Sequence, residues 1–150
     1  MSLIGGSFIN PKLTVRHSSL GGGRGLFAAR SIKKGEILTI SGGVIIPRHE
    51  MNRIPATVRN ICFFAGSGYY MCPRSFKKIS PDFYINHSCS PNAATSENIL
   101  EIIALRDIRA GEEITYDYRT DYNSLEQRYR AWRRFKCRCG SPNCVKVITA

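Results

Sequence analysis

Residues 86–92 read Asn-His-Ser-Cys-Ser-Pro-Asn, and residues 111–118 read Gly-Glu-Glu-Ile-Thr-Tyr-Asp-Tyr. The first stretch gathers amide, imidazole and thiol side chains in a polar turn. In the second stretch, alternate side chains of an extended segment point to one face, so Tyr116 and Tyr118 meet the same environment. The tyrosine pair therefore either packs within a sheet or lines a site.

Other features of the two stretches indicate structure rather than catalysis. His87 taken alone is most simply a structural histidine, and Glu112 and Glu113 follow a turn glycine, where we expect them to be solvated. The sequence has no H-E-x-x-H motif and no evident Ser/His/Asp set, which argues against metalloprotease and serine hydrolase chemistry.

Short apolar stretches recur along the chain, rich in β-branched and aromatic residues and separated by Gly and Pro. They predict strands at 13–17, 26–29, 37–40, 44–46, 61–65, 69–71, 99–105 and 113–116. No helical pattern lies between these strands, so a βαβ architecture is excluded and the fold class is mostly β. Residues 47–80 have weaker patterning, and we expect them to form an insert.

One sequence motif occurs twice, in distant parts of the chain. Residues 30–39 and 106–115 both fit the pattern R-x-I-x-x-G-E-x-[IL]-T. Each copy predicts a strand end, a turn closed by Gly35 or Gly111, and a new strand, because glycine adopts positive φ without steric cost. Two copies are too few for a solenoid, and they predict two similarly built β-arches in one domain.

Length and composition limit the classes of protein to which the chain can belong. The chain has 150 residues, 43% of them hydrophobic and 22% charged, which is typical of one globular domain. Its longest unbroken apolar run, 61–65, is far shorter than the ~20 residues of a membrane span, so we expect no membrane association. The net charge of +11 attracts polyanions such as nucleic acid, or serves solubility alone.

The six cysteines favour a metal site over disulfides. The N-terminus has no basic segment followed by an apolar run and a cleavage site, so we expect a reducing, intracellular compartment. Three of the thiols, Cys137, Cys139 and Cys144, form the pattern C-x-C-x4-C. Zn²⁺ prefers four tetrahedral ligands, so a fourth must come from elsewhere. The candidates for the fourth ligand are Cys62, Cys72, Cys89, His87 and His49.

The C-terminal fifth combines one predicted helix with a concentration of basic residues. Residues 124–127, Ser-Leu-Glu-Gln, form a capping box, and Leu125, Tyr129 and Trp132 have helical spacing. From Asp121 onward the chain has seven basic residues against two acidic ones. These basic residues form either a solvated face or a contact with a polyanion.

A glycine cluster, Gly21-Gly-Gly-Arg-Gly25, precedes the predicted strand 26–29. Glycine lacks the Cβ that would block a close approach of the backbone to a ligand, although a plain β-turn explains the cluster equally well. A dinucleotide-binding motif is excluded, because Gly35 follows too soon for the helix that this motif requires.

Together and in this order, these motifs resemble those of the SET-domain protein lysine methyltransferases. The resemblance covers about residues 13–145, and rests on Gly23-Arg24-Gly25, 86–92, 111–118 and the C-x-C-x4-C segment. It implies a mostly β SET-domain fold, with small sheets around a pseudoknot and short helices. It also implies a SET domain at 1–120, with the insert at about 47–80. A post-SET helix and zinc-binding segment would occupy 121–150 in the same structural unit.

The resemblance also implies cofactors and site residues. S-adenosylmethionine would lie against Gly23, Arg24, Gly25, Asn86, His87 and Tyr118. Cys89 would complete a structural four-cysteine zinc site with Cys137, Cys139 and Cys144. Tyr118 would be the catalytic tyrosine, and Tyr116 would set the number of methyl groups and favour monomethylation. Tyr70, with Tyr69 as the alternate, would be a second tyrosine of the lysine channel.

We therefore expect an enzyme that methylates a lysine of a histone or another basic protein, in the nucleus of a eukaryote or the cytoplasm of a bacterium. The basic C-terminal segment would add a contact with nucleic acid. The alternative is a catalytically idle, zinc-stapled module that binds nucleic acid or nucleosomes through residues 128–138. Retention of Tyr118, Asn86 and His87 favours the enzyme.

Overall fold

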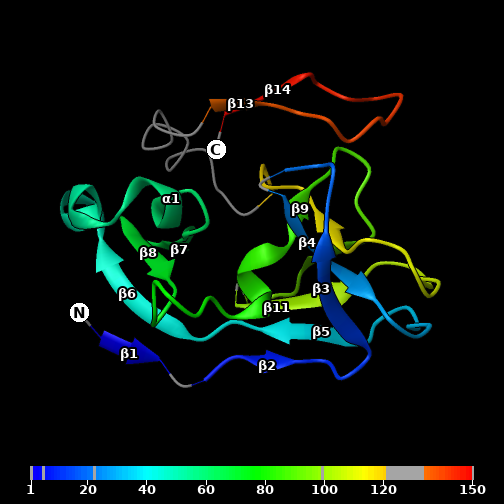
Figure 1. Cartoon of the computed structure of the whole chain (residues 1–150), viewed down its shortest axis with the longest axis horizontal. Coiled ribbons are helices and arrows are strands. Elements are labelled where there is room, and N and C mark those ends of the chain that lie inside the picture. Colours follow the sequence, from blue (N-terminus) through cyan, green and yellow to red (C-terminus); the bar gives the residue numbers. More distant parts are fainter. Residues whose placement is uncertain (1, 5, 22, 99, 121–133, 150) are drawn as a thin grey trace.

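The computed structural model describes residues 2–4, 6–21, 23–98, 100–120 and 134–149. Within these ranges the chain forms five small β-sheets and short helical segments, as Figure 1 shows. The predicted mostly β class is confirmed.

The first four-stranded sheet is antiparallel throughout and carries the N-terminal strand at one edge. Its strands, in order, are β1 (Ser2–Ile4), β6 (Gly43–Pro47), β8 (Tyr69–Cys72) and β7 (Phe63–Gly66). Between β6 and β7 the chain forms the 3-10 helix η1 (Arg48–Arg53) and the short helix α1 (Ala56–Arg59). The buried side chains of this half include Met51, Val58, Cys62, Phe64, Tyr70 and Cys72.

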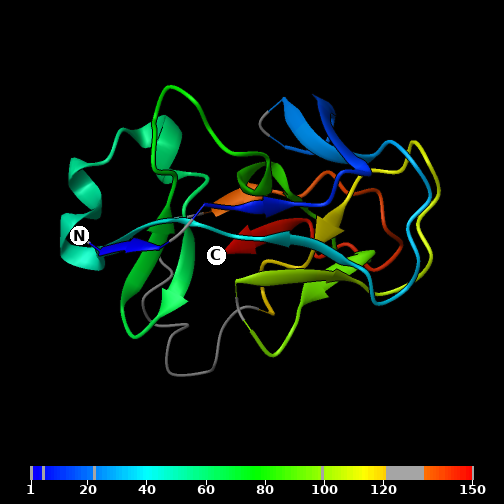
Figure 2. The same ribbon diagram turned by 90° about the horizontal axis from the view of Figure 1, so that it is seen from below.

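The second four-stranded sheet carries the main core. Its strands, in order, are β10 (Ala93–Thr95), β11 (Glu101–Ala104), β5 (Ile37–Ile40) and β2 (Phe8–Ile9). Figure 2 shows β5 (cyan) running between β2 (blue) and β11 (yellow-green). Leu26, Ile32, Leu38, Ile108 and Ile114 are almost completely buried here, and each contributes about 1.5–3 kcal/mol by leaving water.

Three two-stranded pairs complete the described architecture. They are β3 (Leu13–His17) with β4 (Arg24–Ala28), β9 (Asn86–His87) with β12 (Thr115–Tyr116), and β13 (Arg134–Lys136) with β14 (Val147–Thr149). A 3-10 helix, η2 (Pro81–Tyr84), leads into β9. The β13–β14 hairpin lies beside β9, where the rings of Phe135 and His87 meet at a centroid distance of 6.3 Å (Figure 1).

The parallel pairing of β9 with β12 brings the two polar stretches of the sequence together. Asn92 ties them from the side. Its amide donates to the carbonyl oxygen of Glu113 at 2.8 Å, and its Oδ1 accepts from the backbone N–H of Thr115 at 3.0 Å. Asn92 is almost fully buried, and these two hydrogen bonds satisfy its side-chain amide. They also add to the few backbone hydrogen bonds that such short strands can form.

The two copies of the repeated motif, 30–39 and 106–115, form paired arches, as predicted. Ile32 and Ile108, which occupy the same place in the two copies, exchange both backbone hydrogen bonds at 2.9 Å. Gly35 and Gly111 have φ of 83° and 91°, the left-handed region that glycine tolerates. Each arch is therefore closed by the same turn and anchored against the other.

The structure adjusts several predicted elements. The strand predicted at 61–65 begins at Phe63, because the N–H groups of Ile61 and Cys62 close the last turn of α1. The strand predicted at 113–116 is reduced to Thr115–Tyr116, with a single bridge from Glu113 to Phe27. The predicted helix beginning at 124–127 lies outside the described residues. Every helix in the described ranges is too short or too polar to cross a membrane.

Candidate active site and metal centre

A cavity of about 620 Å³ lies where η2, β9, β12 and β13 meet. This volume is in the range of small-molecule and cofactor sites. It is lined by Leu20, Gly21, Arg24, Asn60, Ile61, Phe63, 82–87, Tyr116, Tyr118 and 134–138.

Three aromatic rings form one wall of the cavity. The ring centroids of Tyr116 and Tyr118 are 4.8 Å apart, and Phe135 lies 6.0 Å beyond Tyr118. The hydroxyl of Tyr118 donates to the carbonyl oxygen of Ile85 at 2.8 Å. This bond fixes the orientation of the ring, and Tyr118 is one of the residues that line the cavity.

Asn86 is held by three acceptors at the base of the β3–β4 turn. Its side-chain N–H groups donate to Glu113 Oε1 at 2.7 Å, to the carbonyl oxygen of Arg24 at 2.8 Å and to Ser18 Oγ at 3.2 Å. Ser18 in turn donates to Glu113 Oε2 at 2.9 Å. The network fixes which way the amide faces, and it fastens the glycine turn to β9. The expectation that Glu113 is solvated is therefore wrong, because its carboxylate accepts both donors.

Two glycines of the turn are required by this network. A Cβ on Gly21 would lie 2.5 Å from Asn86 Oδ1, and a Cβ on Gly25 would lie 2.2 Å from Glu113 Oε1. Neither distance is compatible with a side chain. The absence of a Cβ at Gly21 and Gly25 therefore lets the turn pack closely against the side chains of Asn86 and Glu113.

His87 is buried beneath Tyr118 and packs edge-on against its ring, at a centroid distance of 5.3 Å. Burial lowers the pKa of His87, although Asp117 opposes the shift. Burial alone would raise the pKa of Asp117, but hydrogen bonds from Arg119 outweigh it and hold that pKa below its usual value. Asp117 therefore stays a carboxylate whose charge is balanced by Arg119.

Basic residues outnumber acidic ones among the described residues that line the cavity. Arg24, Arg134, Lys136 and Arg138 line it, and all four are exposed. The acidic residue in the lining is Asp82, whose pKa burial raises despite nearby serine hydroxyls. Arg24 also stacks on Tyr84, with the guanidinium carbon 5.5 Å from the ring centroid.

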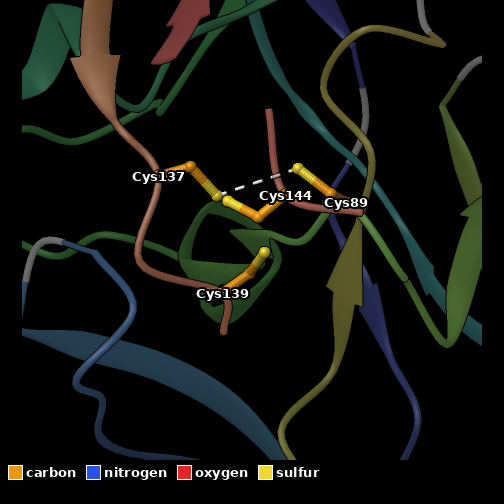
Figure 3. A group of neighbouring side chains, drawn as sticks. All are labelled: Cys89, Cys137, Cys139 and Cys144. Atoms are coloured by element: carbon orange, nitrogen blue, oxygen red, sulfur yellow. Dashed lines mark hydrogen bonds between the residues drawn. The ribbon is translucent and has the colours of Figure 1, made fainter. Parts of the chain in front are cut away.

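The four predicted metal ligands come together beside this cavity. The Sγ atoms of Cys89, Cys137, Cys139 and Cys144 all lie within 4.8 Å of one another, and Figure 3 shows the thiols turned toward one another. Of the other candidates, Cys62 and Cys72 are buried in the core of the first sheet, and His49 is exposed beside Glu50. Cys89 is thus the thiol that joins the C-x-C-x4-C segment.

The donor set fits Zn²⁺. Two sulfur ligands of a tetrahedral site with Zn–S bonds of ~2.3 Å lie ~3.8 Å apart, and Cys89 Sγ lies 3.9 Å from Cys137 Sγ. Burial raises the pKa of Cys89, and it raises the pKa of Cys137 to about 12. Burial also disfavours the Cys139 thiolate, but backbone N–H groups outweigh it and lower that pKa to about 6. A divalent cation would remove this conflict by stabilising all four thiolates.

Comparison with known proteins identifies the family. A model of the SET domain matches residues 23–119. The chain belongs to the SET-domain family. This SET domain is 35% identical over 137 residues to the variant-silencing SET domain-containing protein of Plasmodium falciparum, an alignment that covers 82% of the chain and 5% of that relative. It is 32% identical over 150 residues to the histone-lysine N-methyltransferase Su(var)3-9 of Drosophila melanogaster, covering 85% of the chain and 23% of that relative.

Solved structures agree with the assignment. A chain in the crystal structure of an active polycomb repressive complex 2 in the basal state superposes with a TM-score of 0.58 and 26% identity. The superposition covers 71% of this SET domain and 15% of that chain. The present chain is therefore a small part of the length of the relatives and solved chains it matches.

The SET domain brings most of the predicted site residues to the cavity. Arg24, Asn86, His87, Tyr116 and Tyr118 line it. Gly23 and Gly25 do not, but they shape the adjacent turn. Tyr70 is not brought there: it is buried in the core of the first sheet, edge-on to Phe64 at 5.4 Å.

Phe135 and Glu113 are among the residues of the site that were not predicted. Phe135 lies two positions before Cys137 in an extended segment. Because side chains alternate between the two faces of a strand, this spacing could have predicted that Phe135 and Cys137 lie on the same face. Glu113 offered no comparable signal, because its partners Ser18 and Asn86 are distant in sequence.

Proposed function

We propose that this SET domain is an S-adenosylmethionine-dependent protein-lysine N-methyltransferase. The observation that carries the proposal is the cavity in which Tyr116 and Tyr118 lie opposite a fixed Asn86–His87 strand. Several similar proteins are named histone-lysine N-methyltransferases, which supports the same activity. The chain spans only a small share of the length of those relatives. The activity of the whole protein is therefore part of this proposal.

The residues present fit S-adenosylmethionine. The cavity has the volume of a small-molecule site, Tyr116 and Tyr118 give it ring surface, and Asn86 and His87 supply polar groups among its lining residues. When bound, the cofactor supplies a methyl group activated on a sulfonium. We place it against Arg24, Asn86, His87 and Tyr118, with Gly23 and Gly25 shaping the turn around it.

The residues of the chain must favour the neutral form of the lysine amine and align its nitrogen with the methyl group of the cofactor. An amine with a pKa of about 10.4 costs about 4.6 kcal/mol to deprotonate at pH 7. Desolvation and nearby positive charge both lower the pKa of an amine. The tyrosine wall is apolar and uncharged, and the carboxyl group among the described lining residues is that of Asp82, whose pKa is raised by burial. The remaining contribution is alignment of the amine by fixed rings.

The roles of the tyrosines follow the family resemblance. Tyr118 is the catalytic tyrosine, positioned by Ile85 and His87. Tyr116 limits the space for methyl groups on the amine, so monomethylation is favoured. The resemblance also assigns Tyr70 to the lysine channel, a role that Tyr70→Phe tests.

We assign the cysteine cluster to one structural zinc. Cys89 follows directly on β9, and the other three thiols follow β13. The ion would therefore fasten the C-terminal segment, with Phe135, over the cavity. No open coordination position is needed for this role.

The remaining features of the proposal concern organisation and surroundings. Residues 1–120 form the SET domain, with an insert at about 47–80, and 121–150 form the post-SET segment of the same unit. The substrate is a lysine of a histone or another basic protein. The protein acts inside the cell, at chromatin in a eukaryote or in the cytoplasm of a bacterium.

The test is direct. Zinc-loaded protein is titrated with S-adenosylmethionine by calorimetry, and is then incubated with isotope-labelled cofactor and a mixture of histones and ribosomal proteins. We expect saturable cofactor binding and the transfer of single methyl groups to lysine, read by mass spectrometry. Absence of heat from the loaded protein would contradict the proposal.

A contact with nucleic acid is a second function that one observation favours. Along β13 and its continuation, Arg134, Lys136 and Arg138 are exposed while the residues between them face inward. Lys146 is exposed on the paired segment. Such a basic row suits a phosphate backbone. Binding of a DNA duplex should weaken steeply between low and physiological salt, and a Lys136→Glu, Arg138→Glu variant should lose it. The idle binding module of the alternative would bind DNA but no cofactor.

A further inference from the structure

His87 touches both the catalytic wall and the cysteine cluster. Its Nδ1 accepts a hydrogen bond from the backbone N–H of Tyr118 at 3.2 Å. Its Nε2 lies 3.3 Å from Cys89 Sγ. The side chain is 2% exposed, so both contacts are shielded from water.

The first contact settles the tautomer of the ring. An N–H group that points at Nδ1 requires a lone pair there, so Nδ1 carries no proton. The other polar neighbour of Nδ1, Asp117 Oδ1, is 3.7 Å away, too far for a hydrogen bond, and Asp117 is engaged by Arg119. The proton of the imidazole is therefore on Nε2.

The second contact then has a direction. An Nε2–H group 3.3 Å from sulfur donates to it, and a metal-bound thiolate is a better acceptor than a thiol. Cys89 Sγ belongs to the four-sulfur group, 3.9 Å from Cys137 Sγ. Outer partners of this kind orient metal ligands and tune their donor strength.

We propose that His87 is a positioning residue that connects the zinc centre to the catalytic tyrosine: Nε2–H holds the Cys89 thiolate, and Nδ1 holds the backbone of Tyr118. The inference rests on the proposed function, because it assigns Tyr118 to catalysis and the four thiols to zinc. It adds that loading of the metal and placement of Tyr118 depend on one ring. Removing zinc loosens the partner of Nε2, and the ring that fixes Tyr118 loses one of its two anchors.

Two variants separate the two contacts. The amide of His87→Asn ends near the position of Nδ1, so it can accept from Tyr118 N–H but cannot reach Cys89. The amide of His87→Gln reaches the position of Nε2, so it can donate to Cys89 but leaves Tyr118 N–H without its acceptor. Each variant thus keeps one contact and removes the other.

The readouts do not require turnover. Zinc affinity is measured by competition with a chromophoric chelator, and the cobalt-substituted protein reports sulfur-to-metal charge transfer. We expect His87→Asn to lose about 10- to 100-fold in zinc affinity and to shift the charge-transfer band. We expect His87→Gln to stay near the wild-type zinc affinity. Equal zinc affinity in all three proteins would overturn the proposal.

A measurement on the unmodified protein guards against variants that fail to fold. Nitrogen-15 NMR of zinc-loaded wild-type protein distinguishes the two neutral tautomers of His87. We expect the Nε2–H form, and a proton on Nδ1 would overturn the proposal. Because neither the tautomer nor the zinc affinity depends on methyl transfer, failure of the enzyme assay alone would count against the proposed function and not against this link.

Discussion

The side-chain amide of Asn86 donates a 2.7 Å hydrogen bond to Glu113, which lies 27 positions later in the chain. Glu113 also accepts from Ser18, so one carboxylate fixes both the amide that faces the cavity and the start of the glycine turn. The surface that we propose for cofactor binding is therefore positioned by a residue that does not line the cavity.

Replacement of Glu113 by Gln tests this arrangement. A carboxylate accepts from Asn86 and Ser18 at once, whereas an amide has one acceptor oxygen, so one buried donor is left unsatisfied at a cost of about 1–3 kcal/mol. We expect S-adenosylmethionine binding, measured by calorimetry, to weaken about tenfold. Glu112→Gln is the matched control, because Glu112 is bonded to Arg106 on the other side and should leave the affinity unchanged. Equal effects in the two variants would contradict the role of Glu113.

Gly25→Ala should disturb the same network by sterics. The new Cβ would lie 2.2 Å from Glu113 Oε1 and 2.9 Å from the Cβ of Ser18, so the carboxylate must leave its partners. We expect a loss of about 1–3 kcal/mol in the free energy of unfolding, measured by urea denaturation. Gly6→Ala is the control, since a Cβ at exposed Gly6 meets nothing within 4 Å. A stability equal to wild type in Gly25→Ala would show that the turn has room.

Local patterns in the sequence were sufficient for the arches and for three of the four clustered thiols. The C-x-C-x4-C spacing predicted a metal site for Cys137, Cys139 and Cys144, and the family resemblance chose Cys89 among the candidates for the fourth ligand. The structure places the four sulfur atoms within 4.8 Å of one another. The repeated R-x-I-x-x-G-E pattern predicted two turns that the structure closes with Gly35 and Gly111. In both cases each motif that carries the prediction lies within a short stretch of the sequence.

Contacts between distant segments were not accessible in this way. Glu113 looked solvated because it follows a turn glycine, but its carboxylate accepts hydrogen bonds from Ser18 and Asn86, which are distant in sequence. Tyr70 was assigned to the channel by resemblance, but β8 turns its ring toward Phe64 in a separate core. The helices η1 and α1 were missed because segments of four to six residues have too little periodicity to detect.

Tyr118→Phe should separate binding from chemistry. The hydroxyl is held by Ile85 at 2.8 Å and is not needed to form the cavity wall. We expect turnover to fall about a hundredfold or more, because loss of a single preorganised polar group at a reacting centre has effects of this size. Affinity for S-adenosylmethionine, measured by calorimetry, should change less than about threefold, which is under 1 kcal/mol. Retained turnover would remove Tyr118 from the mechanism.

Tyr116→Phe should change the products rather than the rate. The ring stays 4.8 Å from Tyr118, but the lost hydroxyl leaves more room and one polar contact fewer around the amine. We expect dimethyl- and trimethyl-lysine to appear at the expense of monomethyl-lysine in mass spectra of a lysine peptide. An unchanged product distribution would contradict the role assigned to this tyrosine.

Metal analysis of cysteine variants tests the zinc centre. The four clustered thiols should bind one zinc per chain, because their sulfur spacing matches a tetrahedral site. Cys89→Ser should lower the zinc content and the melting temperature together, since the ion ties the C-terminal segment to β9 and its binding free energy adds to the folding free energy. Cys62→Ala is the control: Cys62 is buried in the core of the first sheet, so this variant should lose stability through packing while retaining its zinc. Full zinc content in Cys89→Ser would move the fourth ligand elsewhere, and His87, 3.3 Å from the Cys89 sulfur, would be the side chain to examine next.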